Sequence, residues 1–146
     1  MTNWDYRFLA MAQLVATWSK DPSSKVGSVI TDGKRIVSLG FNGFPAGTRD
    51  DSSIYDDRER KYRRVLHAEQ NAMSFAKRDL SGCTVYITHP PCARCAAHIV
   101  QEGIRRVVYP TPSADFLARW GEDTKEARAM FEEAGVSFVE LEPVGG

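Results

Sequence analysis

The sequence predicts an α/β protein in which a mixed five-stranded sheet lies between two layers of helices, a three-layer α-β-α sandwich. Short runs rich in β-branched and aromatic residues alternate with helical segments, which is typical of a sheet with helices on both faces. The first two of these runs are joined by Asp32-Gly33, a hairpin turn signal. Because no repeat, low-complexity tract or linker divides the sequence, we expect one domain over residues 1–146.

The first third of the chain is expected to form a helix followed by the hairpin. Pro22 ends a helix over residues 3–20, because proline disfavours the helical conformation in the residue before it. Strands are predicted over residues 25–31 and 35–41, followed by a Gly-, Pro- and Asp-rich loop over residues 42–57 that is long enough to be functional or mobile. Apolar side chains at steps of four and three would pack the first helix into the core; they are Trp4, Phe8, Met11, Val15 and Trp18.

The remaining segments alternate between helix and strand. Gly103 and Gly135 each follow a predicted helix and are expected to end it. The periodicity predicts helices over residues 68–78, 93–102 and 122–134, and strands over residues 84–88, 105–110 and 136–141.

The composition excludes several classes of protein. The chain has 146 residues, of which 42% are hydrophobic and 26% are charged, as in soluble globular domains. Its 19 Lys and Arg balance 19 Asp and Glu, which argues against a broad basic face for a nucleic-acid polymer. No apolar run approaches the roughly 20 residues of a membrane helix. Since the N-terminus also lacks the pattern of a signal peptide, we expect a cytoplasmic protein.

The cysteines favour metal binding over a disulfide framework. There are three, an odd number, and Cys92 and Cys95 form a CxxC pair at the start of a predicted helix, where the helix dipole favours thiolate. Cys83 has no second CxxC around it and is expected to pack at a strand edge. Two roles stay open at this point: a structural zinc, which needs four protein ligands, or a catalytic zinc with three ligands and one open position.

His67 is the candidate third ligand, and Glu69 the candidate base. Residues two apart do not face the same way on a regular helix, so we expect His67 at the helix entrance and Glu69 in the first turn. An acid in a first turn is also favoured by the helix dipole alone. His89 and His98 compete with His67 as ligands, and we expect non-ligand roles for both.

The motifs resemble those of a known enzyme family. H-x-E followed by P-C-x-x-C, here His67-Ala68-Glu69 and Pro91-Cys92-Ala93-Arg94-Cys95, is similar to the signature of zinc-dependent nucleobase deaminases. Longer blocks resemble the deoxycytidylate (dCMP) deaminase family over nearly the whole chain; they read SKDPSSKVGSVI, GFNGFPAG, KYRRVLHAEQNA and GCTVYITHPPCARCA.

The resemblance implies a cytidine deaminase-like fold and a catalytic Zn²⁺ held by His67, Cys92 and Cys95. It implies hydrolysis of dCMP to dUMP and ammonia, supplying thymidylate synthesis, with Glu69 as the proton shuttle. The substrate would be a small-molecule nucleotide. Two alternatives remain: a deaminase of another cytosine nucleotide such as dCTP, and a module whose zinc only holds the fold.

The resemblance also implies a set of substrate contacts. Asn42 would contact the deoxyribose 3′-hydroxyl, and backbone groups around Ala68 and Pro91-Cys92 would hold the cytosine carbonyl. Lys25 would lie near the phosphate, although a solvated strand end explains it as well.

Members of this family are commonly homohexamers that dCTP activates with Mg²⁺ and dTTP inhibits. The resemblance places part of that regulatory site at Asn42, Gly43, Arg49 and Asp50, a stretch that a solvated charged loop would also explain. Three departures from the family pattern bear on substrate and regulation: Phe41 for the usual Tyr, Arg63-Arg64 for Pro-Tyr, and the segment at residues 110–121. The basic cluster at residues 58–64 is expected to be a solvated loop or a subunit contact.

Overall fold

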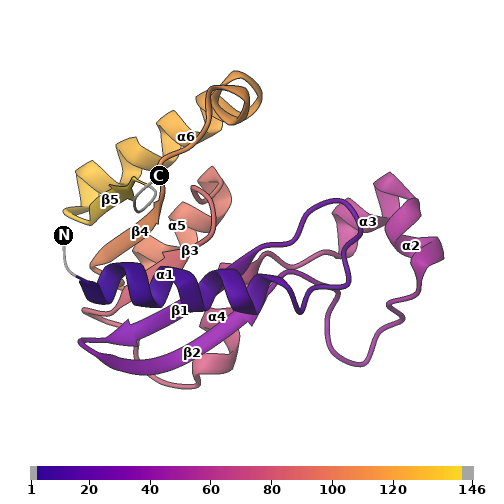
Figure 1. Ribbon diagram of the computed structural model, residues 1–146, viewed down its shortest axis with the longest axis horizontal. Helices are drawn as coiled ribbons and strands as arrows, with labels where there is room; N and C mark the ends of the chain where they lie inside the picture. Colours follow the sequence, from indigo (N-terminus) through magenta and orange to yellow (C-terminus); the bar gives the residue numbers. More distant parts are fainter. Residues whose placement is uncertain (1–2, 143–146) are drawn as a thin grey trace.

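Five strands form one sheet in the order β2-β1-β3-β4-β5 in the computed structural model, which describes residues 3–142 (Figure 1). β1 pairs antiparallel with both β2 and β3, whereas β3, β4 and β5 are parallel. The sheet is therefore mixed and five-stranded, as predicted. Its strands are β1 (Gly27–Asp32), β2 (Arg35–Phe41), β3 (Thr84–Ile87), β4 (Arg106–Pro110) and β5 (Ser137–Leu141).

Helices cover both faces of this sheet, so the predicted three-layer architecture is confirmed (Figure 1). One face packs against α4 (Ala68–Ala76), α5 (Ala93–Gln101) and α6 (Ala114–Ala134), and the other against α1 (Asn3–Ala16). Successive side chains of β3 serve the two cores in turn: Val85 and Ile87 belong to the first core, and Tyr86 to the second. No helix among the described residues is long and apolar enough to span a bilayer.

Two glycines let helices approach the sheet closely. A Cβ at Gly27 would lie 2.0 Å from the backbone oxygen of Ala12 in α1, and one at Gly40 would lie 2.5 Å from the backbone nitrogen of Ala72 in α4. Larger residues at these positions would push the helices away from the sheet. The glycines thereby fix how deeply α4, which begins beside His67, sits on the sheet.

The N-terminal helix is shorter than predicted, and part of its apolar stripe is not in the core. It ends at Ala16, after which Thr17 and Trp18 donate to carbonyls three residues back. Phe8 and Val15 are buried as predicted, but Trp18 lies beyond the helix end and is 51% exposed. Trp4 is also partly exposed, and the guanidinium of Arg7 lies over its ring at 4.6 Å.

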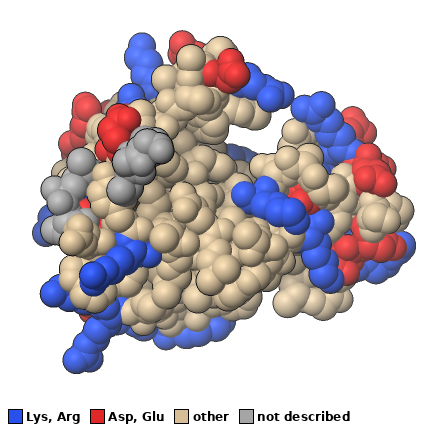
Figure 2. Space-filling model, viewed as in Figure 1, with Lys and Arg blue, Asp and Glu red and all other residues tan. Residues whose placement is uncertain are grey.

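The prediction of a continuous loop after β2 is wrong in its second half. Residues 52–64 form two short helices, α2 (Ser52–Asp56) and α3 (Arg58–Arg64), which project from the body of the molecule (Figure 1). Asp57 caps α3 by accepting the N–H of Arg60. We call residues 42–66 the α2–α3 arm; Figure 2 shows an opening between it and the rest of the molecule on the side of α6.

The last helix begins eight residues earlier than predicted. Ser113 caps α6 by accepting the N–H of Phe116, and the helix continues through Gly121 to Ala134. A glycine inside a helix costs only about 1 kcal/mol relative to alanine, and a good cap together with packing against α5 compensates for it. Residues 114–121 are therefore helical, although no helix was predicted there.

Candidate active site

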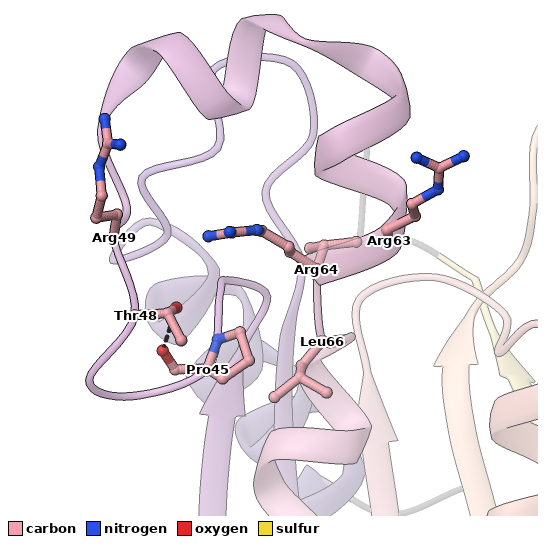
Figure 3. A pocket seen from close by; sticks show the side chains of 7 residues that line it. Pro45, Thr48, Arg49, Arg63, Arg64 and Leu66 are labelled. Atoms are coloured by element: carbon pink, nitrogen blue, oxygen red, sulfur yellow. Dashed lines mark hydrogen bonds between the residues drawn. The ribbon is translucent and has the colours of Figure 1, made fainter.

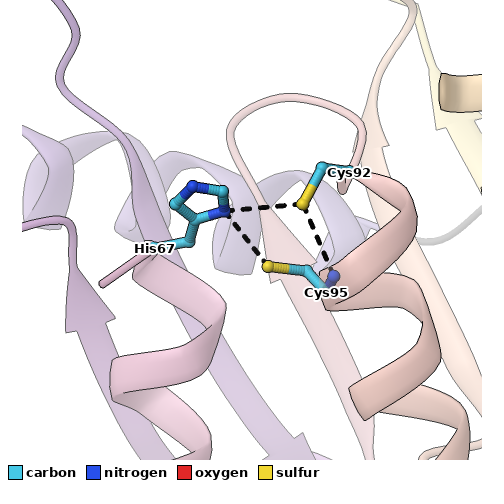
Figure 4. A group of neighbouring side chains, drawn as sticks. All are labelled: His67, Cys92 and Cys95. Atoms are coloured by element: carbon cyan, nitrogen blue, oxygen red, sulfur yellow. Dashed lines mark hydrogen bonds between the residues drawn. The ribbon is translucent and has the colours of Figure 1, made fainter. Parts of the chain in front are cut away.

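Three side chains with metal-binding atoms meet at the N-termini of α4 and α5 (Figure 4). His67 is the N-cap of α4, Cys92 is the N-cap of α5, and Cys95 lies in the first turn of α5. The Nδ1 atom of His67 is 3.2 Å from Cys95 Sγ and 3.5 Å from Cys92 Sγ. All three ligand atoms lie within 4.8 Å of one another, a spacing that could hold one metal ion.

The strand directions explain why the two helix starts meet. β1 is antiparallel to both of its neighbours, so β2 and β3 run in the same direction. The α2–α3 arm and α4 follow β2, and α5 follows β3, so α4 and α5 both begin at the carboxyl edge of the sheet. In open α/β sheets this is the edge at which ligands bind.

The thiols are electrostatically unequal. The hydrogen bond with Cys95, aided by His67 and by the N–H of Cys95, lowers the pKa of Cys92 to about 4. The same hydrogen bond, burial and the nearby Glu69 carboxylate raise the pKa of Cys95. The Cys92 hydrogen bond also raises the pKa of His67. Loading this group with a metal therefore requires the release of protons.

Glu69 is buried next to these ligands, and its carboxylate accepts no well-aligned hydrogen bond within residues 3–142. The residue is 1% exposed, and among the described residues no donor meets both the distance and the angle of a hydrogen bond to either carboxylate oxygen. The Cys95 thiol and the backbone N–H of Glu69 itself lie nearby. Burial raises the pKa of this carboxyl, and the charges of His89 and His67 lower it by less. An orphaned buried carboxylate lowers stability, and such groups concentrate at functional sites.

The competing residues lie outside the ligand group. His89 Nδ1 is 2.7 Å from the carbonyl oxygen of Pro90, and its ring packs against Phe116. His98 is exposed beside Glu102, and Cys83 is buried. Within residues 3–142, His67, Cys92 and Cys95 are the one set of three or more such side chains positioned to hold a metal.

Comparison with known proteins agrees with this geometry. Residues 2–111 match the family model described as the cytidine and deoxycytidylate deaminase zinc-binding region. The chain belongs to this deaminase family. An uncharacterised deaminase of Aliivibrio fischeri is 54% identical over 141 residues, covering 97% of this chain and 95% of that protein. The deoxycytidylate deaminase of Mus musculus is 38% identical over 147 residues, covering 96% of this chain and 80% of that protein.

The fold of the deaminase is also found in solved structures. The dCMP deaminase of cyanophage S-TIM5, solved with dCMP and dUMP, superposes with a TM-score of 0.74 at 22% sequence identity. The match covers 97% of this chain and 98% of that one. The predicted cytidine deaminase-like fold is therefore confirmed.

The side chain of Asn42 forms hydrogen bonds with other residues of the deaminase. Its Oδ1 accepts the N–H of Val26 at 2.8 Å, and its Nδ2 donates to the carbonyl of Ser24 at 2.8 Å and to Asp21. The residue is 5% exposed, so it ties the segment before β1 to the start of the arm. Its contact with a deoxyribose hydroxyl stays a prediction.

The other residues predicted to contact substrate or effector lie before β1, beside the ligand group and in the arm. Lys25 is exposed and donates to the carbonyl oxygen of Ser19, and Ala68 and Pro91 are buried beside the ligand group. In the arm, Arg49 pairs with Asp51 and Asp50 pairs with Lys20, all on the surface.

Two features of the site were not predicted. Asp123 of α6 accepts the N–H of Ala93 at 2.7 Å, which fixes the start of α5 next to Cys92. A cavity of about 490 Å³ lies at the base of the arm (Figure 3). We call it the arginine cavity; it is lined by Pro45, Thr48, Arg49, Arg63, Arg64, Val65 and Leu66. The only sequence signal for it was Arg63-Arg64 in place of the family's Pro-Tyr.

Proposed function

We propose that this deaminase hydrolyses dCMP to dUMP and ammonia, with a zinc ion as cofactor. The observation that carries the proposal is the buried, unpartnered carboxylate of Glu69 beside a group of one histidine and two cysteines. Relatives named deoxycytidylate deaminase support dCMP as the substrate. The structural module considered from the sequence would not need a buried acid at this position.

The residues present fit a catalytic zinc. His67, Cys92 and Cys95 would hold it, and three protein ligands are the pattern of catalytic rather than structural sites. When bound, zinc would act as a Lewis acid that lowers the pKa of a water molecule. Two thiolates and a neutral imidazole would balance its charge.

Glu69 would move the protons of the reaction. Its carboxylate takes one proton from the attacking water and delivers it to N3 of the cytosine ring. After the new C4–O bond has formed, the same residue moves the second water proton to the amino group. The C4–N bond then breaks, and ammonia leaves with the electron pair of that bond. Burial raises the pKa of Glu69 towards the range in which a carboxyl both takes and returns a proton.

Substrate positioning follows from the residues around the ligand group. We assign the cytosine carbonyl to backbone groups near Ala68 and Pro91, the deoxyribose 3′-hydroxyl to Asn42, and a place near the phosphate to Lys25. Ala68 and Pro91 flank the metal ligands directly in the chain, which supports the first assignment.

Regulation and assembly are part of the proposal. The protein would act in the cytoplasm as a homohexamer that supplies thymidylate synthesis. dCTP with Mg²⁺ would activate it and dTTP inhibit it, through Asn42, Gly43, Arg49 and Asp50. Exposed apolar side chains that include Leu14, Trp18 and Phe41 support an oligomer. Figure 2 shows a broad surface over α1 that is largely free of charged side chains.

The test is ammonia release by the zinc-loaded protein from dCMP, deoxycytidine, CMP and dCTP in parallel, each with and without dCTP or dTTP as effector. Turnover of dCMP well above the other substrates is expected. Turnover of dCTP instead would support the same zinc chemistry with a different substrate. The arginine cavity is the observation that favours this alternative, because a triphosphate carries more negative charge than a monophosphate. No ammonia from any of the four would refute the proposal.

A further inference from the structure

The arginine cavity has the size and the lining of a binding site for a small anion. Its volume of about 490 Å³ lies within the range of small-molecule sites, roughly 300–1,000 Å³. Three of its seven lining residues are arginines, and none is an acid. A solvated charged surface normally mixes both signs, so this lining favours a negatively charged ligand.

Two of these arginines are not neutralised by the protein. Arg49 forms an ion pair with Asp51 at 2.6 Å, but within residues 3–142 neither Arg63 nor Arg64 has an acidic partner. Arg64 is half-buried, and Figure 3 shows its side chain extending across the cavity towards the loop that carries Arg49. Arg63 points to the opposite side of the helix end (Figure 3). A guanidinium group presents N–H donors in a planar fork that matches a phosphate.

The cavity and the metal-ligand group are formed by neighbouring residues of the chain. Two backbone hydrogen bonds between Gly43 and Leu66, of 3.1 and 2.8 Å, close the base of the α2–α3 arm. Leu66 lines the cavity, and the next residue, His67, is one of the three ligands. A ligand in this cavity would therefore lie against the residue that precedes the metal ligand His67.

The position of α3 is itself fixed by an ion pair. Lys61 donates to Asp21 and to the hydroxyl of Ser23, each at 2.8 Å. Both charged side chains of this pair are largely buried. The lysine of the basic cluster therefore holds the helix in place, and Arg64 is the arginine after it that extends across the cavity.

We propose that the arginine cavity binds the phosphate of a nucleotide, with Arg64 as its principal contact. The inference rests on the proposed function, because it assumes that the deaminase acts on a nucleotide. The phosphate has two possible sources, the substrate itself or a second, effector nucleotide. Because the cavity-lining Leu66 directly precedes the ligand His67, the substrate is the expected source.

The test compares Arg64→Ala with Arg60→Ala, a control on the same helix that removes the same charge outside the cavity. Arg64→Ala should raise the KM for dCMP about ten-fold or more, leave kcat unchanged and leave turnover of deoxycytidine unaffected. Arg64→Lys should fall between wild type and Arg64→Ala, because lysine keeps the charge without the fork. Arg60→Ala should behave as wild type.

The remaining outcomes separate the possibilities. A normal KM for dCMP with a lost response to dCTP or dTTP would support the phosphate site and assign it to an effector. Equal changes in Arg64→Ala and Arg60→Ala would mean that only long-range charge acts, and would overturn the proposal. An unchanged KM for dCMP together with an unchanged response to dCTP and dTTP would overturn it as well. If wild-type protein deaminates nothing, the proposed function fails. Calorimetric titration of pyrophosphate into wild type and Arg64→Ala then tests the cavity alone, and equal affinities would overturn it.

Discussion

At the scale of single residues, the unpartnered carboxylate of Glu69 is the feature that separates a catalytic site from a structural one. Nothing in the fold needs an acid here, since neither of its oxygens accepts a well-aligned hydrogen bond within the part of the chain that the structure describes. A buried carboxylate that lowers stability is expected to serve chemistry.

Replacing Glu69 with glutamine should therefore abolish activity without unfolding the protein. We expect deamination to fall by about two to four orders of magnitude, because glutamine cannot carry the proton. Zinc content should equal that of wild type, and the thermal midpoint should not fall. Glu126→Gln, on the exposed side of α6, is the control. Near-normal ammonia release by Glu69→Gln would exclude the proton-shuttle role.

Much of this site could be predicted from the sequence, because its parts are local. His67 and Glu69 are two residues apart, Cys92 and Cys95 are three apart, and both pairs precede apolar periodicity that predicts a helix. Asp123 could not be found in this way. Its partner, the N–H of Ala93, is 30 residues away in the chain, and nothing local to Asp123 indicates that contact.

At the scale of elements, the short helices of the arm were missed for a physical reason. α3 has the sequence RERKYRR, in which Tyr62 is the one aromatic residue and is exposed, so the segment carries no hydrophobic period. Helices this short are not stable alone and depend on tertiary contacts. For α2 these include the stacking of Tyr55 on Phe44 at 4.2 Å, and for α3 the ion pair of Lys61 with Asp21.

The contact between α6 and α5 should matter for metal binding. Asp123 holds the N–H of Ala93 and thereby orients the turn that carries Cys92. Asp123→Ala should weaken zinc affinity about 10- to 100-fold, as for other residues that orient metal ligands, and Asp123→Asn should recover most of it because the amide oxygen still accepts. Equilibrium transfer of zinc to a chromogenic chelator measures this directly.

Two further variants serve as the positive and negative controls for the Asp123 experiment. Cys92→Ser should lose zinc outright, and Glu122→Ala, an exposed neighbour, should retain it as wild type does. If Asp123→Ala holds zinc as tightly as wild type, the contact is structural only. A loss of zinc in Glu122→Ala as well would point to general weakening of α6.

At the scale of the whole molecule, equal numbers of acidic and basic residues leave no net charge to drive acid unfolding near neutrality. The response to pH then depends on individual pairs, and Asp21 with Lys61 is the most buried pair between Lys or Arg and an acid in residues 3–142. Burial alone would raise the pKa of Asp21. The hydrogen bonds from Lys61, Ser23 and Ser24 outweigh it, so the pKa is lowered. This pair joins the α2–α3 arm to the segment before β1, so its loss should destabilise both segments.

The sign of the pH effect follows from that shift. Because the folded-state pKa of Asp21 lies below its unfolded value of about 3.9, the stabilisation is complete above that value and is lost as the pH falls through the folded pKa. Asp21→Asn should lower the free energy of unfolding by about 3 kcal/mol at pH 6, since it leaves Lys61 buried without its partner. The difference from wild type should stay constant down to about pH 4 and shrink below it. Urea unfolding from pH 7 to pH 3 measures this, with Asp32→Asn in the exposed pair with Arg78 as the control. A difference that instead grew on acidification would mean that Asp21 is protonated in the folded protein and that the arm is held by other contacts.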